Sequence, residues 1–294
     1  MNLQLSMPPE KAQMLDTITG HLRRVPNIAA VVLGGSHARG FARPDSDIDI
    51  GIYYHETLPF PVDELRSIAE RVSAPGKSPV VTGPYEWGAW VNGGAWIHTP
   101  AGKVDFLYKN LEQIRAVIDE GQRGIWRHDY DQQPPYGFRS VVYLGETQMC
   151  VPLHDPVGEI ARLKQSVSDY PRALRGRIVQ ECLWQAEFTF FVCRTFVQTS
   201  DIYSTAGCMT RVAQALVHAL FALNNEYFVS DKYANRLIDQ FAVRPPDFTS
   251  RLARILSNPG TASAELASSL ELLRSLWLEI VGLTAGSYEP RYLL

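Results

Sequence analysis

The sequence predicts an α+β fold, in which a domain built on a mixed β-sheet is followed by an all-α helical bundle. In the first half, a continuous apolar run and a strictly alternating run are separated by glycine-rich turns, as is typical of strands. In the second half, apolar residues recur at helical spacing, and Pro171, Pro245-Pro246 and Pro259 separate the segments. We therefore expect residues 1–156 to form the sheet domain and residues 157–294 the helical domain.

The composition is that of an ordinary globular protein, with 46% apolar and 20% charged residues and a net charge of −3. No run of Lys or Arg is present, so we do not expect a nucleic-acid partner. The four cysteines form no C-x-x-C pair, which argues against a zinc site. The N-terminus lacks the pattern of a signal peptide, and we expect no apolar run long enough to cross a bilayer. These features predict a cytoplasmic protein without a membrane partner, and they leave its oligomeric state open.

The N-terminal pattern predicts a sheet of about five strands with helices on one face. The expected elements are a helix over 10–24, strands over 28–33 and 47–53, a helix over 62–72, a short strand over 80–82, helices over 111–121 and 137–148, and an edge strand over 151–154. Residues 84–108 are expected to form antiparallel hairpins, with turns at Asn92-Gly93-Gly94 and Pro100-Ala101-Gly102.

The stretch that organises the N-terminal half runs from Leu33 to Tyr53. A buried strand leads into Gly34 and Gly35, which permit a tight turn and close approach of the backbone to a ligand. Ser36 follows at the expected start of a helix, where its backbone N–H and its hydroxyl can face an anion. This turn is therefore a candidate phosphate site.

Two carboxylates follow the turn on one alternating strand. Because side chains alternate faces along a strand, Asp47 and Asp49 share one face while Ile48 and Ile50 face the core. Burying two such charges is costly unless they are paired or bind a metal. Magnesium accepts oxygen ligands and usually also binds substrate phosphates. The pattern predicts a magnesium site beside the phosphate turn, and the competing interpretation is an exposed strand with aspartates on its solvated face.

The run G-G-S-x-A-R-G-x(5)-S-D-x-D-x-G resembles the signature of nucleotidyltransferases of the DNA polymerase beta superfamily, notably the antibiotic-type and minimal members with a C-terminal helical domain. That family has a third carboxylate on a later strand, and Asp105 in V-D-F-L-Y matches it. The matching elements span roughly residues 28 to 108, and weaker similarity continues through the C-terminal half.

The resemblance implies an enzyme that transfers a nucleoside monophosphate from ATP or another nucleoside triphosphate and releases pyrophosphate. Asp47, Asp49 and Asp105 would be its catalytic residues and would hold two Mg²⁺ ions, with Asp105 as a candidate to take the proton of the acceptor. Gly35, Ser36 and Arg39 would face the β- and γ-phosphates.

The helical half contains three further candidates. The resemblance implies that a lysine of this half reaches the triphosphate, and Lys232 is the matching position, although it could equally be a solvated lysine at a helix start. Asp201 is a candidate for acceptor binding, and the competing role is that of a helix N-cap. Arg211 and His218 resemble the Arg–His pair of helical ribonucleases, but the apolar neighbours of His218 favour a packed core histidine.

An aromatic segment beside Asp105 suggests where the acceptor binds. Aromatic rings and a carboxylate suit a sugar-like or cationic compound, and in this segment we select Trp90 and Glu86 as acceptor-binding candidates. The same rings could stack on nucleotide bases. We therefore expect a small polar acceptor such as an antibiotic. The alternatives are nucleotidylation of a partner protein or an RNA end, and a non-catalytic nucleotide-binding module.

Overall fold

The computed structural model describes residues 7–292, which fall into two compact units. The N-terminal unit runs to Asp119 and continues from 129 to 169, and the C-terminal unit comprises 120–128 and the chain from Tyr170 onward. The N-terminal unit thus extends beyond the expected boundary at 156. The reason is that the chain after the last strand, β8 (Val151–His154), forms α6 (Glu159–Ser166), which packs against β1 (Ile28–Leu33) of the sheet.

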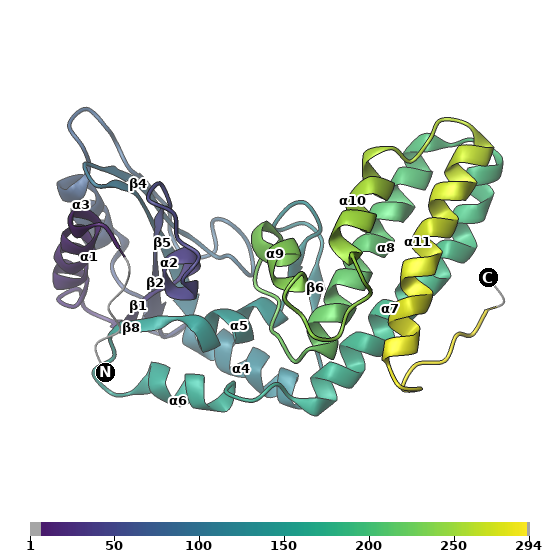
Figure 1. Ribbon diagram of the computed structural model, residues 1–294. Coiled ribbons are helices and arrows are strands. Elements are labelled where there is room, and N and C mark those ends of the chain that lie inside the picture. Colours follow the sequence, from purple (N-terminus) through teal and green to yellow (C-terminus); the bar gives the residue numbers. More distant parts are fainter. Residues whose placement is uncertain (1–6, 293–294) are drawn as a thin grey trace. The chain divides into compact units, whose positions relative to one another are not determined.

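The N-terminal unit is built on a mixed six-stranded sheet in the order β3-β4-β5-β2-β1-β8 (Figure 1). The remaining strands are β2 (Ile48–Tyr54), β3 (Val80–Val81), β4 (Gly94–Thr99) and β5 (Gly102–Asn110). The strands β2 and β5 are parallel, and the other neighbours are antiparallel. A separate ribbon pairs β6 (His128–Asp129) with β7 (Phe138–Arg139). The sheet agrees with the α+β class predicted from the sequence.

One face of the sheet packs against α1 (Pro9–Leu22) and α3 (Val62–Val72) (Figure 1). A proline in the first turn of α1 already has the φ angle that a helix requires. In α3, Asp63 and Glu64 occupy the first turn, where the helix dipole favours negative charge. The isoleucines of β2 meet the buried leucines of both helices in one hydrophobic core. The alternation of β2 therefore leaves the side chain of Asp49 on the opposite face.

That opposite face carries α2 (Gly35–Arg39) and α5 (Val141–Met149) (Figure 1). The helix α2 packs against both β2 and α5, and Tyr53 of β2 is buried beside Glu146 and Cys150. Helices therefore lie on both faces, and the expectation of helices on one face was wrong. The long connection from β5 to β8, which contains α4 (Leu111–Gln122) and α5, supplies this cover.

The first expected hairpin is absent, because residues 84–93 form turns and not a strand. Tyr85 has a φ of +67° and Gly88 a φ of +134°, neither of which belongs to a strand. The side chain of Gln132 holds this segment, since it accepts from Trp90 N at 2.7 Å and donates to Trp87 O at 2.9 Å. The second expected hairpin is confirmed as β4 and β5, which join at Pro100 to Gly102.

The C-terminal unit is helical within the described residues (Figure 1). Its elements are α7 (Arg172–Gln198), α8 (Ile202–Leu223), the 3₁₀ helix η1 (Asp231–Tyr233), α9 (Ala234–Ile238), α10 (Phe248–Ser257) and α11 (Ser263–Leu283). The helices α7, α8 and α11 pack on one another as the centre of the bundle.

The helix α8 is long and apolar enough to cross a membrane, so the expectation that no segment reaches this length was wrong. Its apolar window is 72% buried inside the unit, as in the core helix of a bundle. His218 of this helix is buried. Its ring centroid lies 4.3 Å from that of Phe228 and 5.6 Å from that of Trp126. This packing agrees with the core histidine favoured from the sequence.

Candidate active site

The parallel pairing of β2 with β5 brings two of the predicted carboxylates side by side. Asp49 and Asp105 are register partners on these neighbouring strands, so their side chains leave the same face of the sheet. Both residues are half-buried. Two residues so far apart in sequence meet because the chain between them returns to the sheet beside β2.

Asp47 directly precedes β2 and is the third member of the group. Burial raises the pKa of the Asp105 carboxyl above its ordinary value, and the negative charge of Asp47 raises it further. Lys103 and His98 oppose this shift. The charges of Asp47 and Asp105 therefore influence each other, while Asp49 is placed beside Asp105 by the strand register.

The glycine turn lies directly against Asp49. The backbone N–H of Gly34 donates to Asp49 O at 2.8 Å, and Gly35 adopts a φ of +57°. A Cβ on Gly35 would fall 1.7 Å from Asp49 Oδ2, so only glycine leaves room for this carboxylate. The glycine turn and the Asp49 carboxylate thus share one small space, and the binding of phosphate by this turn stays a prediction.

The short helix after the turn holds the other predicted phosphate residues. Ser36 is buried in α2, and Gly40 ends the helix in the left-handed conformation. Arg39 Nε donates a hydrogen bond to Met149 Sδ of α5 over 3.1 Å. The contact of Arg39 with phosphate stays a prediction.

Two buried basic side chains hold the loop that ends at Asp47, and neither was expected from the sequence. Lys11 of α1 is only 5% exposed, and its Nζ donates to Ser46 O at 2.5 Å. His37 of α2 also hydrogen-bonds the Ser46 backbone, while its burial lowers its pKa. The carbonyl next to Asp47 is thus held from two helices. A lysine on the apolar face of a predicted helix was the signal that could have identified Lys11.

Comparison with known families identifies this region. Residues 16–90 match the family described as nucleotidyltransferase domain. The match contains the glycine turn and both carboxylates of the β2 motif, and Asp105 lies beyond it. The chain carries a nucleotidyltransferase domain. Such a domain supports transfer of a nucleoside monophosphate in general.

A second family match covers residues 142–234 and is described as a domain of unknown function, DUF4037. The chain is also similar to a nucleotidyltransferase-like protein of known structure from Exiguobacterium sibiricum. That similarity has 11% sequence identity and a TM-score of 0.46, and covers 94% of this chain and 78% of the other. No curated protein matches the chain.

The donor set of the nucleotidyltransferase domain suits a hard cation, because it consists of carboxylate oxygens. Among residues 7–292, no three His, Cys, Asp or Glu side chains form a group that could hold a metal ion. Magnesium is commonly bound by one or two carboxylates together with substrate phosphates and water. The arrangement therefore fits a cation that binds along with a triphosphate.

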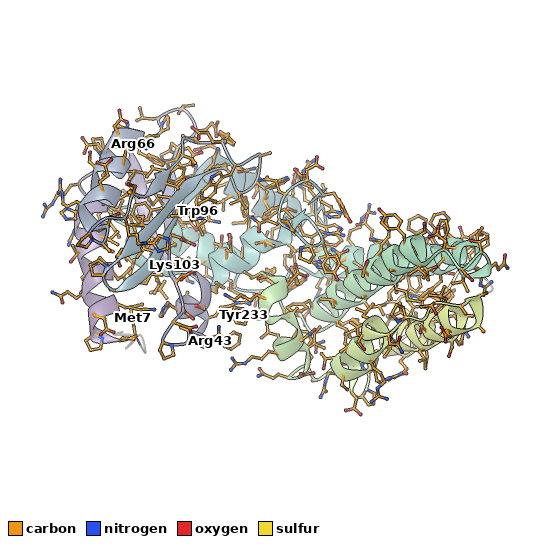
Figure 2. The ribbon with its side chains drawn as sticks, turned by 90° about the horizontal axis from the view of Figure 1, so that it is seen from above. Met7, Arg43, Arg66, Trp96, Lys103 and Tyr233 are labelled. Carbon is orange, nitrogen blue, oxygen red and sulfur yellow. The ribbon has the colours of Figure 1, made fainter. Side chains whose placement is uncertain are left out.

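An aromatic wall borders Asp105, but it is formed by Trp96 rather than by Trp90. Trp96 of β4, which is labelled in Figure 2, is the register partner of Asp105. Register partners project from the same face of a sheet, so both side chains leave the same face. Trp96 is 52% exposed and stacks on Trp87, with ring centroids 4.9 Å apart. The alternation of β4 and its hairpin with β5 could have identified Trp96 from the sequence.

The two acceptor candidates of the N-terminal unit lie in the irregular segment before β4. Trp90 stacks on Phe138 at 5.1 Å, and its carbonyl accepts a hydrogen bond from Tyr143 Oη. These contacts give Trp90 a packing role. Glu86 is exposed in the turn after β3. The structure does not bring either residue into the carboxylate cluster by any described contact, and their acceptor roles stay predictions.

Lys232 and Asp201 belong to the C-terminal unit. Lys232 is exposed in η1, and its Nζ lies 5.7 Å from the ring centroid of Tyr233. Asp201 caps α8, since its Oδ1 accepts from Ser204 N at 3.0 Å. This is the N-cap role that the sequence offered as the alternative. The nucleotide contact of Lys232 and the acceptor contact of Asp201 stay predictions.

Proposed function

We propose that the protein is a magnesium-dependent nucleotidyltransferase that moves a nucleoside monophosphate from a nucleoside triphosphate, ATP in the first instance, to a hydroxyl of a small polar acceptor. The observation that carries the proposal is the pairing of Asp49 with Asp105, beside Asp47 and directly against the Gly34-Gly35 turn. Carboxylates and a glycine turn in one space suit a metal and a triphosphate together.

In this proposal, Asp47, Asp49 and Asp105 would hold two Mg²⁺ ions. When bound, the ions would stabilise the charge on the attacking and leaving oxygens of an in-line displacement. The Gly35 and Ser36 backbone, with Arg39, orients the β- and γ-phosphates, and Lys232 is the corresponding candidate in the C-terminal unit.

The reaction joins the acceptor oxygen to the α-phosphorus and breaks the bond from that phosphorus to the bridging oxygen of the β-phosphate. Pyrophosphate leaves with the electron pair of the broken bond. The acceptor hydroxyl loses its proton, and we assign its uptake to Asp105. In the absence of a bound ion, burial and the charge of Asp47 raise the pKa of this carboxyl, and its place beside Asp49 makes it the candidate to accept the proton.

For the acceptor we infer a sugar-like or cationic compound. The exposed face of Trp96, stacked on Trp87, offers a flat apolar surface beside Asp105. Such a surface binds sugar rings by stacking and cations through cation–π contact. Glu86, Trp90 and Asp201 are the further acceptor candidates.

The test supplies the purified protein with Mg²⁺ and each nucleoside triphosphate in turn, labelled on the α-phosphate. Separate reactions contain aminoglycosides, lincosamides and other polyols, purified tRNA, or total cell protein. Mass spectrometry then identifies what has gained a nucleoside monophosphate. We expect label on a small hydroxylated compound and an equal amount of pyrophosphate. Label only on tRNA or protein would overturn the small-acceptor proposal, and no transfer to any acceptor class would contradict the proposed activity.

A further inference from the structure

The C-terminal unit contains a groove that no part of the proposed nucleotidyl transfer uses. It is a cavity of about 750 Å³ at the start of α7, bordered by the segment that follows α4 and by the chain after α11. Four arginines line it: Arg123, Arg172, Arg177 and Arg291. No Asp or Glu is among the residues that form its wall. All parts of the wall belong to the C-terminal unit.

The positive charge of this groove is only partly offset by the protein. Glu120 lies near Arg123 and also pairs with Arg127. Glu181 is a nearby carboxylate, and it pairs with Arg177 at 2.5 Å while also accepting from Trp126 Nε1. The side chains of Arg172 and Arg291 form no hydrogen bond or ion pair with any residue in the described part of the chain. Like charges that converge on one cavity repel each other, and a bound anion would relieve that repulsion.

The wall that carries Arg291 is fixed in place. Glu187 is fully buried, and its Oε1 accepts from the backbone N–H groups of Arg291 at 2.6 Å and Tyr292 at 2.5 Å. The hydroxyl of Tyr288 donates to the other oxygen of the same carboxylate. The chain after α11 is therefore anchored through its backbone, which leaves the Arg291 guanidinium available to the groove.

We propose that this arginine groove binds a small ligand that carries a chain of two or more phosphate groups. Guanidinium groups match phosphate oxygens in bidentate pairs. The four guanidinium groups present more N–H donors than the oxygens of one phosphate group can pair in bidentate fashion, which favours a ligand with more than one phosphate. The arginines converge on a single cavity instead of following a line, which favours a compact polyphosphate over an extended nucleic-acid strand.

Two kinds of ligand carry such a chain of phosphate groups: inorganic polyphosphate and a nucleotide. The groove also has an apolar side, where Ile125 is 42% exposed beside the half-buried ring of Trp126. A nucleotide could place its base there, whereas inorganic polyphosphate would leave this side unused. A comparison of the affinities for the two ligands therefore shows which of them the groove prefers.

Gly176 provides a variant that blocks the groove without disturbing the fold. It lies in the wall, is exposed, and a Cβ on it would meet no atom within 4 Å. Gly176→Glu therefore places a carboxylate in the groove, and glutamate is a better helix former than glycine. The matched control is Gly207→Glu in α8, an exposed glycine outside the groove whose Cβ would also meet nothing within 4 Å. Arg172→Ala is compared with Arg175→Ala, an exposed arginine of the same helix that does not line the groove.

The experiment is calorimetric titration of the full chain with inorganic tripolyphosphate and with ATP, in EDTA so that no divalent ion is present. We expect Arg172→Ala and Gly176→Glu each to raise the dissociation constant of tripolyphosphate by at least about tenfold, while both controls bind as the wild type does. Asp49→Asn should not change this binding. Tighter binding of ATP than of tripolyphosphate supports a nucleotide, and equal binding supports inorganic polyphosphate. Unchanged binding in both groove variants, an equal loss in Arg175→Ala, or binding of single-stranded RNA alone would overturn the proposal.

Discussion

Asp49 Oδ2 occupies the space that a side chain on Gly35 would need, since a Cβ there would fall 1.7 Å from this oxygen. The two positions belong to different elements, the first turn of α2 and the strand β2, and the hydrogen bond from Gly34 N to Asp49 O joins them. The position of the carboxylate therefore depends on the absence of a side chain one residue before Ser36. This relationship links the phosphate turn to the metal site that we propose.

Replacing Gly35 with alanine should abolish nucleotidyl transfer by moving the Asp49 carboxylate. We expect a loss of at least about 100-fold in kcat, the order seen when a positioned catalytic group is displaced. The positive φ of Gly35 adds strain, so the melting temperature should also fall. The control is Gly40→Ala, which has a similar positive φ but whose Cβ would meet nothing within 4 Å. A Gly35→Ala enzyme no less active than the Gly40→Ala enzyme would contradict the assigned role of this turn.

Lys11→Met should slow the reaction although Lys11 belongs to α1 and precedes the motif. The substitution keeps a long apolar stem but removes the donor to Ser46 O, which holds the loop next to Asp47. We expect kcat to fall by about tenfold, which corresponds to the loss of one charged hydrogen bond, with a smaller change in the KM for ATP. The same change at Lys77, an exposed turn residue, should leave kcat unchanged. An unaltered kcat in Lys11→Met, with only a lower melting temperature, would reduce Lys11 to a structural residue.

Trp96 and Trp90 should respond differently to replacement by alanine. Trp96 is half exposed beside Asp105, so Trp96→Ala should raise the KM for the acceptor while changing stability little. Trp90 stacks on Phe138, so Trp90→Ala should destabilise the N-terminal unit by about 3 kcal/mol. Urea unfolding and acceptor kinetics on both variants measure this contrast. The reverse pattern would return the acceptor role to Trp90, as the sequence alone had suggested.

Lys232→Ala should weaken binding of a triphosphate more than binding of a monophosphate. A charge-assisted contact to phosphate contributes about 1.5–3 kcal/mol, and Lys232 is exposed, so the fold should tolerate its loss. Calorimetry with a non-hydrolysable triphosphate and with the matching monophosphate, both with Mg²⁺, provides the comparison. Arg236→Ala, which removes another exposed cation of the same segment, is the control. Equal affinities of wild type and Lys232→Ala for the triphosphate would leave Lys232 a solvated lysine.

The sequence was sufficient to predict the strand and helix bounds that depend on local signals. Ile28–Leu33 and Val62–Val72 were predicted to the residue, because a buried apolar run and a helical repeat are each unambiguous there. The carboxylate cluster was predictable too, since alternation puts Asp47 and Asp49 on one face and the family signature adds Asp105. The strand pairing that puts Asp105 beside Asp49 is a long-range contact that no local pattern contains.

The predictions that were wrong also failed because they depended on contacts between residues far apart in the sequence. The segment 84–93 is rich in aromatic residues and so resembles a strand. However, Gln132, which is about forty positions away, bonds the backbone at Trp87 and Trp90, where a strand would need a neighbouring strand. Likewise, Trp90 was selected over Trp96 because proximity in sequence cannot show which tryptophan is the register partner of Asp105. The helices on the second face of the sheet were not predicted, because nothing in the sequence around Tyr53 shows that its side chain is buried beside α5.

The most direct test of the account compares Asp49→Asn with Asp45→Asn in the transfer assay. Asp45 is an exposed neighbour whose described ion pair is with Arg43, so its variant controls for the loss of one nearby negative charge. The measured quantity is pyrophosphate formed with Mg²⁺, ATP and the acceptor identified by labelling. We predict wild-type rates for Asp45→Asn and no detectable pyrophosphate for Asp49→Asn or for the wild type in EDTA. The melting temperature of Asp49→Asn should be unchanged or higher, because one charge leaves a repelling cluster. Pyrophosphate formation by Asp49→Asn at the wild-type rate, or in EDTA, would contradict the metal-dependent mechanism.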